Sequence, residues 1–512
     1  MTNYRMRVAV FDGVLPARFG VLAGIILLLM TAKLPAEDAV YRFTHVQTVR
    51  GPCCGDMGVD LVVDDNDSVL VAGRRGGLDL DRDGTVDLDT YGTPDSLVFM
   101  SHDGNMSGWI QGPGGPQEDS ANGIASDGHG GVYAAGMFTD ILHTGDVSIS
   151  GAGKTDGFLI RFDPDGEVLW TIAIGGTEND RLHDVSSDAD GNAYVSGIVR
   201  GPVDLDRDGD VDIAASSAHR FLIASFDPQG QLRWSRTFEG DGVVRISTIV
   251  AGSDGAIYVG GAYMGGALDV DADGTPDVPE AIVNRAPRGP TDVDMNAFYA
   301  RLNTAGDIQW VNAVSGPGIQ VVGALAVAYN GDLLVLGGYL GDADFDADGE
   351  IDLEWQSLGS EQVWKTGQDG NTFLLRTSPA GKQHWVRRYA AGGSHIAAYQ
   401  DQLLLGGSYT GVLDLDGDGV PESLADPDDR QEGFMALLDS TGNVQQVFTV
   451  VGGDADAVLA VGATSDGSKL YATGYTRLGA DFDGDGEIES ASKCHQLGDV
   501  YLALYELEPA LR

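Results

Sequence analysis

The stretch Gly175-Gly-Thr-Glu-Asn-Asp180, continued by Asp188–Gly197, Phe221–Phe226 and Trp234, is one copy of a unit that recurs along most of the chain. The tryptophan that ends each copy recurs at intervals of 61, 64, 76 and 75 residues, at Trp109, Trp170, Trp234, Trp310 and Trp385. In a sixth copy Gln446 takes its place. Self-similarity at a period of this size is the signature of a repeat architecture.

Each copy predicts four strands. A short apolar run and a run of the Tyr-Val-x-Gly type flank an Asp-Gly or Asn-Gly turn, and two further runs are joined by turns such as Asp163-Pro-Asp-Gly166. Such runs and turns are hairpin signals, and a tandem four-stranded unit is typical of a propeller blade. The sequence therefore predicts an all-β, seven-bladed β-propeller over residues 41–507, with copies that begin near residues 52, 113, 175, 240, 316, 392 and 452.

The two ends of this region complement each other. The seventh copy stops after its third strand, Val500–Leu507, and the region begins with an isolated strand-like run, Tyr41–Val49, that aligns with a fourth strand. We expect the N-terminal strand to complete the last blade. Closure of this kind removes exposed sheet edges, which otherwise favour aggregation.

The pattern resembles the bacterial SBBP β-propeller repeats, most clearly in Gly114–Trp170 and Gly175–Trp234. The resemblance covers roughly residues 41–507. It implies a propeller in an exported bacterial protein, and it implies no particular activity.

Six copies contain an acidic loop of the form Asp-x-Asp-x-Asp-Gly between their second and third strands. We number each loop from its first aspartate, and position 9 is also acidic in all six. The predicted ligands at positions 1, 3, 5 and 9 are Asp79, Asp81, Asp83 and Asp87; Asp204, Asp206, Asp208 and Asp212; Asp269, Asp271, Asp273 and Asp277; Asp344, Asp346, Asp348 and Asp352; Asp414, Asp416, Asp418 and Glu422; and Asp481, Asp483, Asp485 and Glu489. The second copy has Asp140-Ile-Leu-His-Thr-Gly145 instead and lacks the site.

Calcium is a hard cation that takes six to eight oxygen ligands, and alternate carboxylates around a glycine turn supply them. The motif resembles the EF-hand loop, in which a bidentate acid follows at position 12. Only Glu280 fits that position, so the other five loops need a further ligand or water. We therefore predict up to six Ca²⁺ sites, with dissociation constants of about 10⁻⁴ to 10⁻³ M in five of them.

The charge of the chain supports organised cation binding. Its 31 Lys and Arg face 77 Asp and Glu, for a net charge of -46, which excludes nucleic acid and anionic membranes as direct partners. The acids recur between apolar runs, unlike those of a disordered acidic tail. Carboxylates this close repel one another by about 1 kcal/mol per pair even in water, so a cation would convert repulsion into ligation.

The N-terminal 36 residues predict export. Arg5, Arg7 and Arg18 precede the apolar run Phe19–Ala32, which is typical of a secretory signal peptide and is shorter than the roughly 20 residues of a spanning helix. An N-terminal anchor is the alternative for residues 1–36. We expect a secreted, periplasmic or cell-surface protein without direct membrane binding after cleavage of the signal.

The three cysteines are disulfide candidates. Cys53 and Cys54 follow the strand that should complete the last blade, and Cys494 lies in a loop of that blade. A bond from Cys494 to either of them would join the two ends of the propeller, with about 5 kcal/mol from loop entropy, although that account of disulfides is disputed. Free thiols are the alternative.

The sequence favours a non-enzymatic binding module whose partner is a protein or a glycan, recognised on the face that bears the acidic loops. The alternative is an exported propeller enzyme with a site at the central channel. The enzyme would be a calcium-dependent hydrolase of the lactonase kind or one that resembles the quinoprotein dehydrogenases. Those dehydrogenases have eight blades and a tryptophan-docking sequence that is absent from this chain. No G-x-S-x-G or H-E-x-x-H motif is present, so no catalytic residue is predicted.

Overall fold

The computed structural model describes residues 40–49, 56–78, 88–91, 94–102, 104, 108–206, 208–214, 220–240, 244–264, 268–269, 275, 277, 295–346, 350–354, 371–423, 430–489 and 498–508. Every structural statement below concerns these residues. They contain strands and no helix, so the prediction of an all-β fold is confirmed. None of their segments is a helix long and apolar enough to cross a membrane. The predicted signal peptide and all three cysteines lie outside the described residues.

The strands form antiparallel sheets whose members follow one another along the chain. The first two sheets comprise β2 (Met57–Val63), β3 (Ser68–Arg75), β4 (Asp95–His102) and β5 (Ile110–Gln111), then β6 (Ser120–Ser126), β7 (Val132–Thr144), β8 (Val147–Phe162) and β9 (Val168–Ile174). The third comprises β10 (Arg181–Ser187), β11 (Ala193–Val199), β12 (Arg220–Phe226) and β13 (Leu232–Gly240), with the short β16 (Leu268–Asp269) added at its edge.

The next sheet has eight strands, which are two four-stranded sets joined by a single parallel bridge between Met295 and Ile319. The first set is β14 (Val244–Ala251), β15 (Ile257–Met264), β17 (Met295–Leu302) and β18 (Ile308–Val314), and the second is β19 (Ile319–Val327), β20 (Leu333–Leu340), β21 (Asn371–Thr377) and β22 (Gln383–Tyr389).

Two sheets remain, and one of them unites the ends of the chain. One comprises β23 (Gly392–Tyr399), β24 (Gln402–Thr410), β25 (Gln431–Asp439) and β26 (Val444–Gly452), with the short β29 (Ala480–Asp481) at its edge; the other comprises β27 (Ala457–Ala463), β28 (Lys469–Thr476), β30 (Asp499–Leu507) and β1 (Tyr41–Val49). The predicted pairing of the N-terminal strand with the last one is present, from Tyr41 opposite Leu507 to Val49 opposite Val500.

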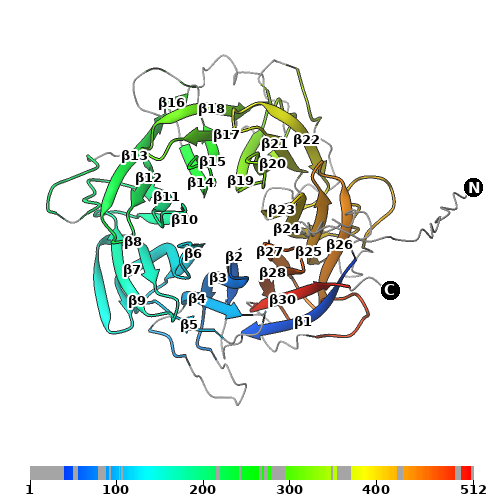
Figure 1. Ribbon diagram of the computed structural model, residues 1–512, viewed down its shortest axis with the longest axis horizontal. Coiled ribbons are helices and arrows are strands. Elements are labelled where there is room, and N and C mark those ends of the chain that lie inside the picture. The colour runs from blue at the N-terminus through cyan, green and yellow to red at the C-terminus, as the bar shows by residue number, and fades with distance from the viewer. Residues whose placement is uncertain are drawn as a thin grey trace, which may run out of the picture. The chain divides into compact units, whose positions relative to one another are not determined.

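Within residues 40–508 the sheets lie around a common central axis, as blades of a β-propeller (Figure 1). The first strand of each four-stranded set lies nearest the axis and the fourth lies at the periphery (Figure 1). The core fills the spaces between neighbouring sheets. One cluster, for example, joins Leu70 and Val98 of the first sheet to Ile124, Phe138 and Phe158 of the second.

The recurring tryptophans join each sheet to the next. The indole Nε1 of Trp109 donates to the carbonyl of Pro164 at 3.1 Å, and Trp170, Trp234 and Trp310 make the same bond to the turn between the third and fourth strands of the following set. Gly166 in that turn has φ +86°, and a Cβ there would lie 2.6 Å from the ring of Trp109. The turn therefore requires glycine for both its backbone conformation and its packing.

Gln446 replaces the tryptophan where the following sheet has no such turn. That sheet is completed by β1 rather than by a strand connected to β30. The side-chain amide of Gln446 donates to the carbonyl of Tyr41 at 2.8 Å, and its oxygen accepts from the backbone N–H of Tyr41 at 3.1 Å. The amide therefore binds the start of the N-terminal strand at the place where a continuous turn stands in the other sheets.

Candidate functional site

The acidic loops lie between the second and third strands of their sheets, as predicted. Four of them are described for most of their length and follow β11, β20, β24 and β28. Asp269 and Asp277 of a fifth loop are also described. The predicted ligands outside the described residues are Asp79, Asp81, Asp83, Asp87, Asp271, Asp273, Glu280 and Asp348.

The four loops share one backbone closure. The residue before position 1 pairs with the residue at position 10 in three of them, as Val203–Ile213, Ala343–Leu353 and Leu413–Ser423. In the fourth loop the N–H of Glu489 at position 9 donates to the carbonyl of Ala480 at 3.1 Å. The loop is therefore a short hairpin whose two ends are joined by backbone hydrogen bonds.

The acid at position 9 has a defined role in each loop. Its carboxylate accepts the backbone N–H of position 2, at 2.6 Å from Leu205 to Asp212 and at 2.7 Å from Leu415 to Glu422. The same bond joins Phe345 to Asp352 and Phe482 to Glu489, at 2.7 Å in both. One carboxylate oxygen is thus engaged and orients the group.

Position 6 shows why the motif contains glycine. Gly209, Gly419 and Gly486 have φ values of +99°, +87° and +88°, in the left-handed region. A Cβ at these positions would meet no atom within 4 Å, so the backbone conformation and not crowding is the reason for glycine. The turn brings the N–H of Gly209 to the carboxylate of Asp204 at 3.0 Å, and Gly419 and Gly486 bind Asp414 and Asp481 in the same way.

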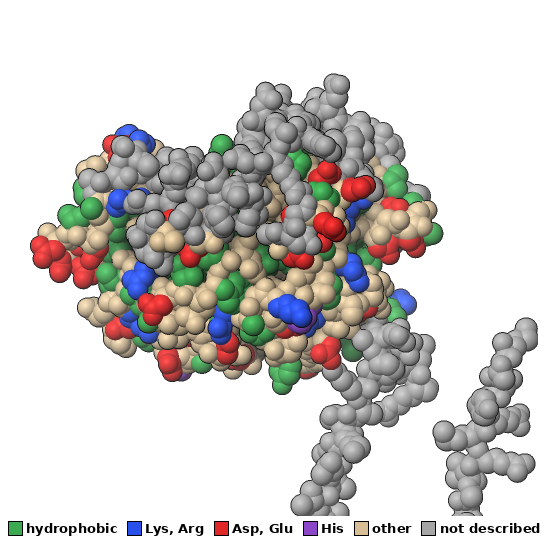
Figure 2. Space-filling view, turned by 90° about the horizontal axis from the view of Figure 1, so that it is seen from above, with side chains coloured by type: hydrophobic (Ala, Val, Ile, Leu, Met, Phe, Trp, Pro, Cys, Tyr) green, Lys and Arg blue, Asp and Glu red, His purple; other side chains and the backbone are tan. Residues whose placement is uncertain are grey.

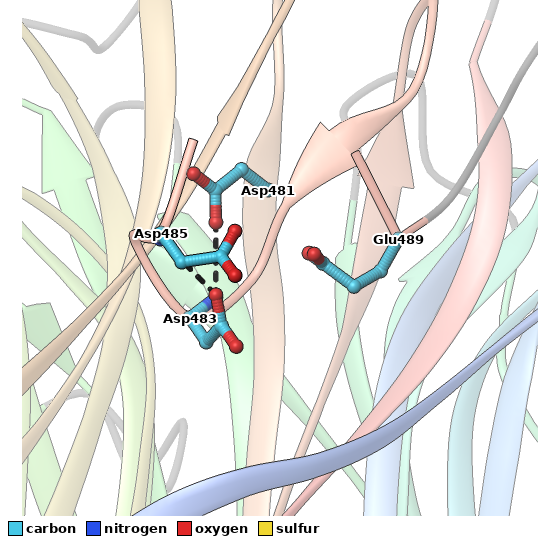
Figure 3. Close-up of side chains that lie close together, drawn as sticks. All are labelled: Asp481, Asp483, Asp485 and Glu489. Carbon is cyan, nitrogen blue, oxygen red and sulfur yellow. Dashed lines mark hydrogen bonds between the residues drawn. The ribbon is translucent and has the colours of Figure 1, made fainter. Parts of the chain in front are cut away.

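This geometry brings together the carboxylates that the sequence predicted as ligands. In each group one oxygen per residue lies within 4.8 Å of the others: Asp204, Asp206 and Asp212; Asp344, Asp346 and Asp352; Asp414, Asp416 and Glu422; and Asp481, Asp483, Asp485 and Glu489. Figure 3 shows the last group, in which Glu489 faces the three aspartates across the loop. Asp208 and Asp418, at position 5, are described but lie outside these groups.

The carboxylates of a group repel one another. Burial raises the pKa of Glu489, and the charges of Asp481 and Asp483 raise it further. A backbone hydrogen bond from Asp208 lowers the pKa of Asp206, but partial desolvation and the charges of its acidic neighbours raise it by more. Acidic side chains also gather in clusters on the surface in Figure 2, where Lys and Arg are scattered. A cation in such a loop would relieve the repulsion.

Two buried oxygens provide a test of whether the loops fit a cation. The Oδ1 atoms of Asp204 and Asp414 are inaccessible to solvent and have no hydrogen-bond partner among the described residues. Each belongs to a position 1 carboxylate whose Oδ2 accepts the N–H of the position 6 glycine. A buried carboxylate oxygen without a partner is costly. A hard cation bound at this atom would remove that cost, so the residues present fit calcium.

The loops also contact the preceding sheet. Asp269 pairs with Glu239 of β13, and Asp481 pairs with Val451 of β26. A bridge joins Asp344 to Ser315, the residue after β18. In three loops the backbone of position 1 therefore lies in the seam between two neighbouring four-stranded sets.

The second sheet differs, as the sequence predicted. Its β7 and β8 continue past the point where the other loops begin, and Ile141 to Thr144 pair with Ser150 to Val147. His143 forms a bridge with Gly114, and its ring packs against that of Tyr91 with 4.6 Å between the ring centroids and 33° between the planes. A backbone-paired hairpin without grouped carboxylates thus occupies the place of an acidic loop.

A cavity of about 470 Å³ lies on the central axis. Its walls include residues from the first strand of every four-stranded set, among them Asp60, Asp184 and His395. Asp60 accepts the N–H of Ile124 at 2.9 Å, and Asp184 accepts the N–H of Ile249 at 2.9 Å. These two carboxylates therefore join first strands of neighbouring sets.

The wall of the cavity is acidic around Asp60 and Asp184. The Oδ1 of Asp60 lies 3.5 Å from Nε2 of His395. Burial raises the pKa of Asp184, and the charge of Asp60 raises it further. No Lys or Arg is among the described residues that line the cavity.

Sequence reasoning did not find these cavity residues. They stand at β-bulges in the first strands, such as the one between Gly58 and Asp60 and the one between Leu182 and Asp184. A bulge turns a side chain out of the alternating pattern that identifies a strand face. The one available signal was a charged residue inside an otherwise apolar first strand.

No protein-family model matches the chain. An uncharacterized WD repeat-containing protein, L264, of Acanthamoeba polyphaga mimivirus is 21% identical over 239 residues, which are 43% of this chain and 16% of that protein. The match thus spans less than a fifth of the relative's length.

Several solved structures resemble the chain at low identity. They include the WD40 repeats of RRP9 (TM-score 0.40, 9% identity, 92% of this chain and 100% of that one) and BamB from Moraxella catarrhalis (TM-score 0.40, 12% identity, 91% and 100%). A chain of the mitotic checkpoint complex has a TM-score of 0.42 and 11% identity over 96% of this chain and 99% of that one. The description of the fold rests on the strand pairing given above.

Proposed function

We propose that the chain is an exported calcium-binding β-propeller with seven blades in a closed ring, and that it serves as a non-enzymatic binding module for a protein or a glycan. The observation that carries the proposal is the geometry shared by four acidic loops. Each has the same backbone closure, the same bond from position 2 to position 9 and a group of carboxylates within 4.8 Å.

The strand pairing supports seven blades. Of 30 strands, the two-residue β16 and β29 attach to the edges of other sheets, and the 28 that remain divide into seven sets of four. The first strands of the sets contact one another in sequence, from β2 to β6, β10, β14, β19, β23 and β27, and β27 contacts β2. This cycle of contacts, together with the pairing of β1 with β30, supports closure.

Calcium in these loops would act mainly on stability. Position 1 lies in a seam between neighbouring sets in three loops, so a cation held there would fix the loop against the preceding blade. Because all acidic loops follow the second strand of their set, they would project from one face of the ring. A rigid face of this kind suits recognition of a partner, and the ring itself needs no chemistry.

Differential scanning calorimetry with and without calcium tests the proposal. At 10 mM Ca²⁺, a site with a dissociation constant of about 10⁻⁴ to 10⁻³ M adds about 1.4 to 2.7 kcal/mol to the free energy of unfolding. Several such sites together would raise the melting temperature by about 10 °C relative to chelator. In protein equilibrated by dialysis against about 1 mM Ca²⁺, atomic emission should find more calcium than in the surrounding buffer.

A pair of variants with the same change of charge supplies the control. Asp414→Asn removes a proposed position 1 ligand, and Asp146→Asn changes an exposed residue in the turn of the β7–β8 hairpin. Asp414→Asn should reduce the calcium-induced increase in melting temperature and the bound calcium by about one site, and Asp146→Asn should leave both unchanged. Equal melting in calcium and in chelator would overturn the calcium proposal.

A further inference from the structure

The first strands of the sheets carry a second group of charged and polar side chains at the central cavity, apart from the acidic loops. Each first strand has a β-bulge, and the bulged residue lines the cavity: Val59, Asn122, His183, Ser247, Gly323, Ser394 and Leu459. These residues stand at equivalent positions and have different chemistry. The wall of the cavity is therefore chemically asymmetric although the strands that form it are equivalent.

The residue two positions before the bulge lies toward the start of each first strand. At this position the seven sets have Met57, Ser120, Arg181, Arg245, Val321, Gly392 and Ala457. Only two neighbouring sets thus place a cation at this level, and both side chains are exposed. In a chain with a net charge of -46, two adjacent arginines are notable because neither forms an ion pair among the described residues.

A hydrogen-bonded chain fixes the two arginines near each other. The Nε of Arg181 donates to Nε2 of His183 at 3.0 Å, and Nδ1 of His183 donates to the carbonyl of Ile246 at 2.7 Å. Ile246 is the neighbour of Arg245, so His183 connects the two strand starts. Burial lowers the pKa of His183 to about 4, and the positive charges of Arg181 and Arg245 contribute to the decrease. The neutral imidazole is therefore the acceptor that orients Arg181.

The opposite charge lies deeper in the cavity. Asp184 is three residues beyond Arg181, about 10 Å along the strand. Its carboxylate and that of Asp60 line the cavity, and each has lone pairs left after its bonds to backbone N–H groups. The axis of the cavity therefore runs from a cationic rim to an acidic interior, with neutral polar side chains such as Asn122 and Ser247 between them.

We propose that this end of the cavity binds a small zwitterion, whose carboxylate lies between Arg181 and Arg245 and whose ammonium group reaches Asp60 and Asp184. Guanidinium groups form charge-assisted, bidentate hydrogen bonds with carboxylates, which are the strongest of the ordinary hydrogen bonds. A ligand with an anionic group at both ends would be repelled by the two aspartates. A ligand with a cationic group at both ends would be repelled by the two arginines.

Isothermal titration calorimetry with three probes of equal length tests the proposal on the intact protein in calcium. The probes are 6-aminohexanoate, hexanoate and 1-aminohexane. We expect 6-aminohexanoate to bind at least about tenfold more tightly than either of the other two, because only it engages both ends of the cavity. Equal affinity for 6-aminohexanoate and hexanoate, or no measurable binding of 6-aminohexanoate, would overturn the proposal.

Variants at the rim locate the site. Arg181→Gln and Arg245→Gln should each weaken binding of 6-aminohexanoate about tenfold and leave that of 1-aminohexane unchanged. Arg236→Gln, on the outer strand β13, is the matched control and should bind all three probes as the native protein does. Unchanged affinity in both rim variants would contradict the assignment. The comparison of the three probes needs no variant, so a folding defect would not prevent the test, and its outcome is independent of calcium binding.

Discussion

The hairpin of β7 and β8 and the acidic loop between β28 and β30 occupy the same place in their sheets and are built in opposite ways. The hairpin extends the ladder from Ile141–Ser150 to Thr144–Val147 and buries Leu142. The acidic loop replaces that ladder with four carboxylates around a glycine turn. Both contact the preceding sheet, through Gly114–His143 and Val451–Asp481.

The difference shows that the same connection can be closed by backbone pairing or can carry grouped carboxylates, which we propose are stabilised by a cation. The hairpin satisfies its polar groups with its own backbone and needs nothing from solution. The loop leaves oxygens that repel one another until a cation binds. Calcium should therefore stabilise the acidic loop and should have no effect on the β7–β8 hairpin.

The largest expected effect is on backbone hydrogen exchange. When a chelator removes calcium, exchange should become faster in the acidic loops and should not change in the β7–β8 hairpin. The position 2 amides of Leu205, Leu415 and Phe482, which bind the position 9 acids, should exchange at least about tenfold faster in chelator, because ligation no longer holds the loop closed. The amides of the β7–β8 hairpin should exchange at the same rate in calcium and in chelator. Hydrogen exchange with mass spectrometry measures both. A uniform change across the chain would contradict the distinction between hairpin and loop.

A smaller effect should change sign with calcium. Glu489→Gln removes one of four mutually repelling charges, so in chelator the variant should melt about 1 °C higher than the native protein. In 10 mM calcium the same variant should melt lower, because it has lost a ligand. Asp146→Asn in the hairpin should shift by a similar small amount in both conditions. The same sign for Glu489→Gln in both conditions would show that its carboxylate is not a ligand.

A third effect, of pH on buried carboxyl groups, should not distinguish the two regions. Asp119 of the hairpin sheet binds the N–H groups of Gly115 and Thr139, and Asp180 binds those of Gly176 and Arg200 in the next sheet. Burial raises the pKa of Asp119 to about 7, that of Asp180 to about 6 and that of Asp456 to about 8. The folded state therefore binds more protons than the unfolded state between about pH 4 and pH 8.

Each of these groups stabilises the fold fully below its ordinary pKa, and the contribution is lost as the pH rises through the raised pKa. In chelator the melting temperature should consequently fall by a few degrees between pH 5 and pH 8.5. Asp119→Asn should reduce the slope, and Asp165→Asn at an exposed turn should not. Scanning calorimetry across this range decides the point. A melting temperature that rises with pH would contradict the assignment.

The sequence predicted the features that repeat. The tryptophans, the glycine turns and the spacing of the acids recur locally, so the position of Trp109 on the turn at Pro164 and the grouping of Asp481 with Glu489 follow from periodicity. The blade that lacks an acidic loop is also predictable, because Asp140 is not followed by acids at positions 3, 5 and 9.

The features that occur once were not predictable. The partner of Gln446 is a backbone segment 405 residues away, and no local pattern indicates it. His183 and Asp184 look like ordinary residues of a half-exposed strand, and only the bulge in the structure shows that they line the cavity. The sequence predicts the acid at position 9 as a ligand. It does not predict that this acid accepts the N–H of position 2, because that bond depends on the closure of the loop in three dimensions.

The pairing of β1 with β30 has a consequence for how the protein is made. Tyr41 lies opposite Leu507, so β1 finds its partner only after all the strands between β1 and β30 have been synthesised. Contacts between residues this distant in sequence form slowly. The early blades can assemble during synthesis, but the last sheet can form only afterwards. A chain truncated before β30 would leave β1 without its partner and the edge of β28 exposed. This exposed edge would let cellular quality control distinguish an incomplete chain from a complete one.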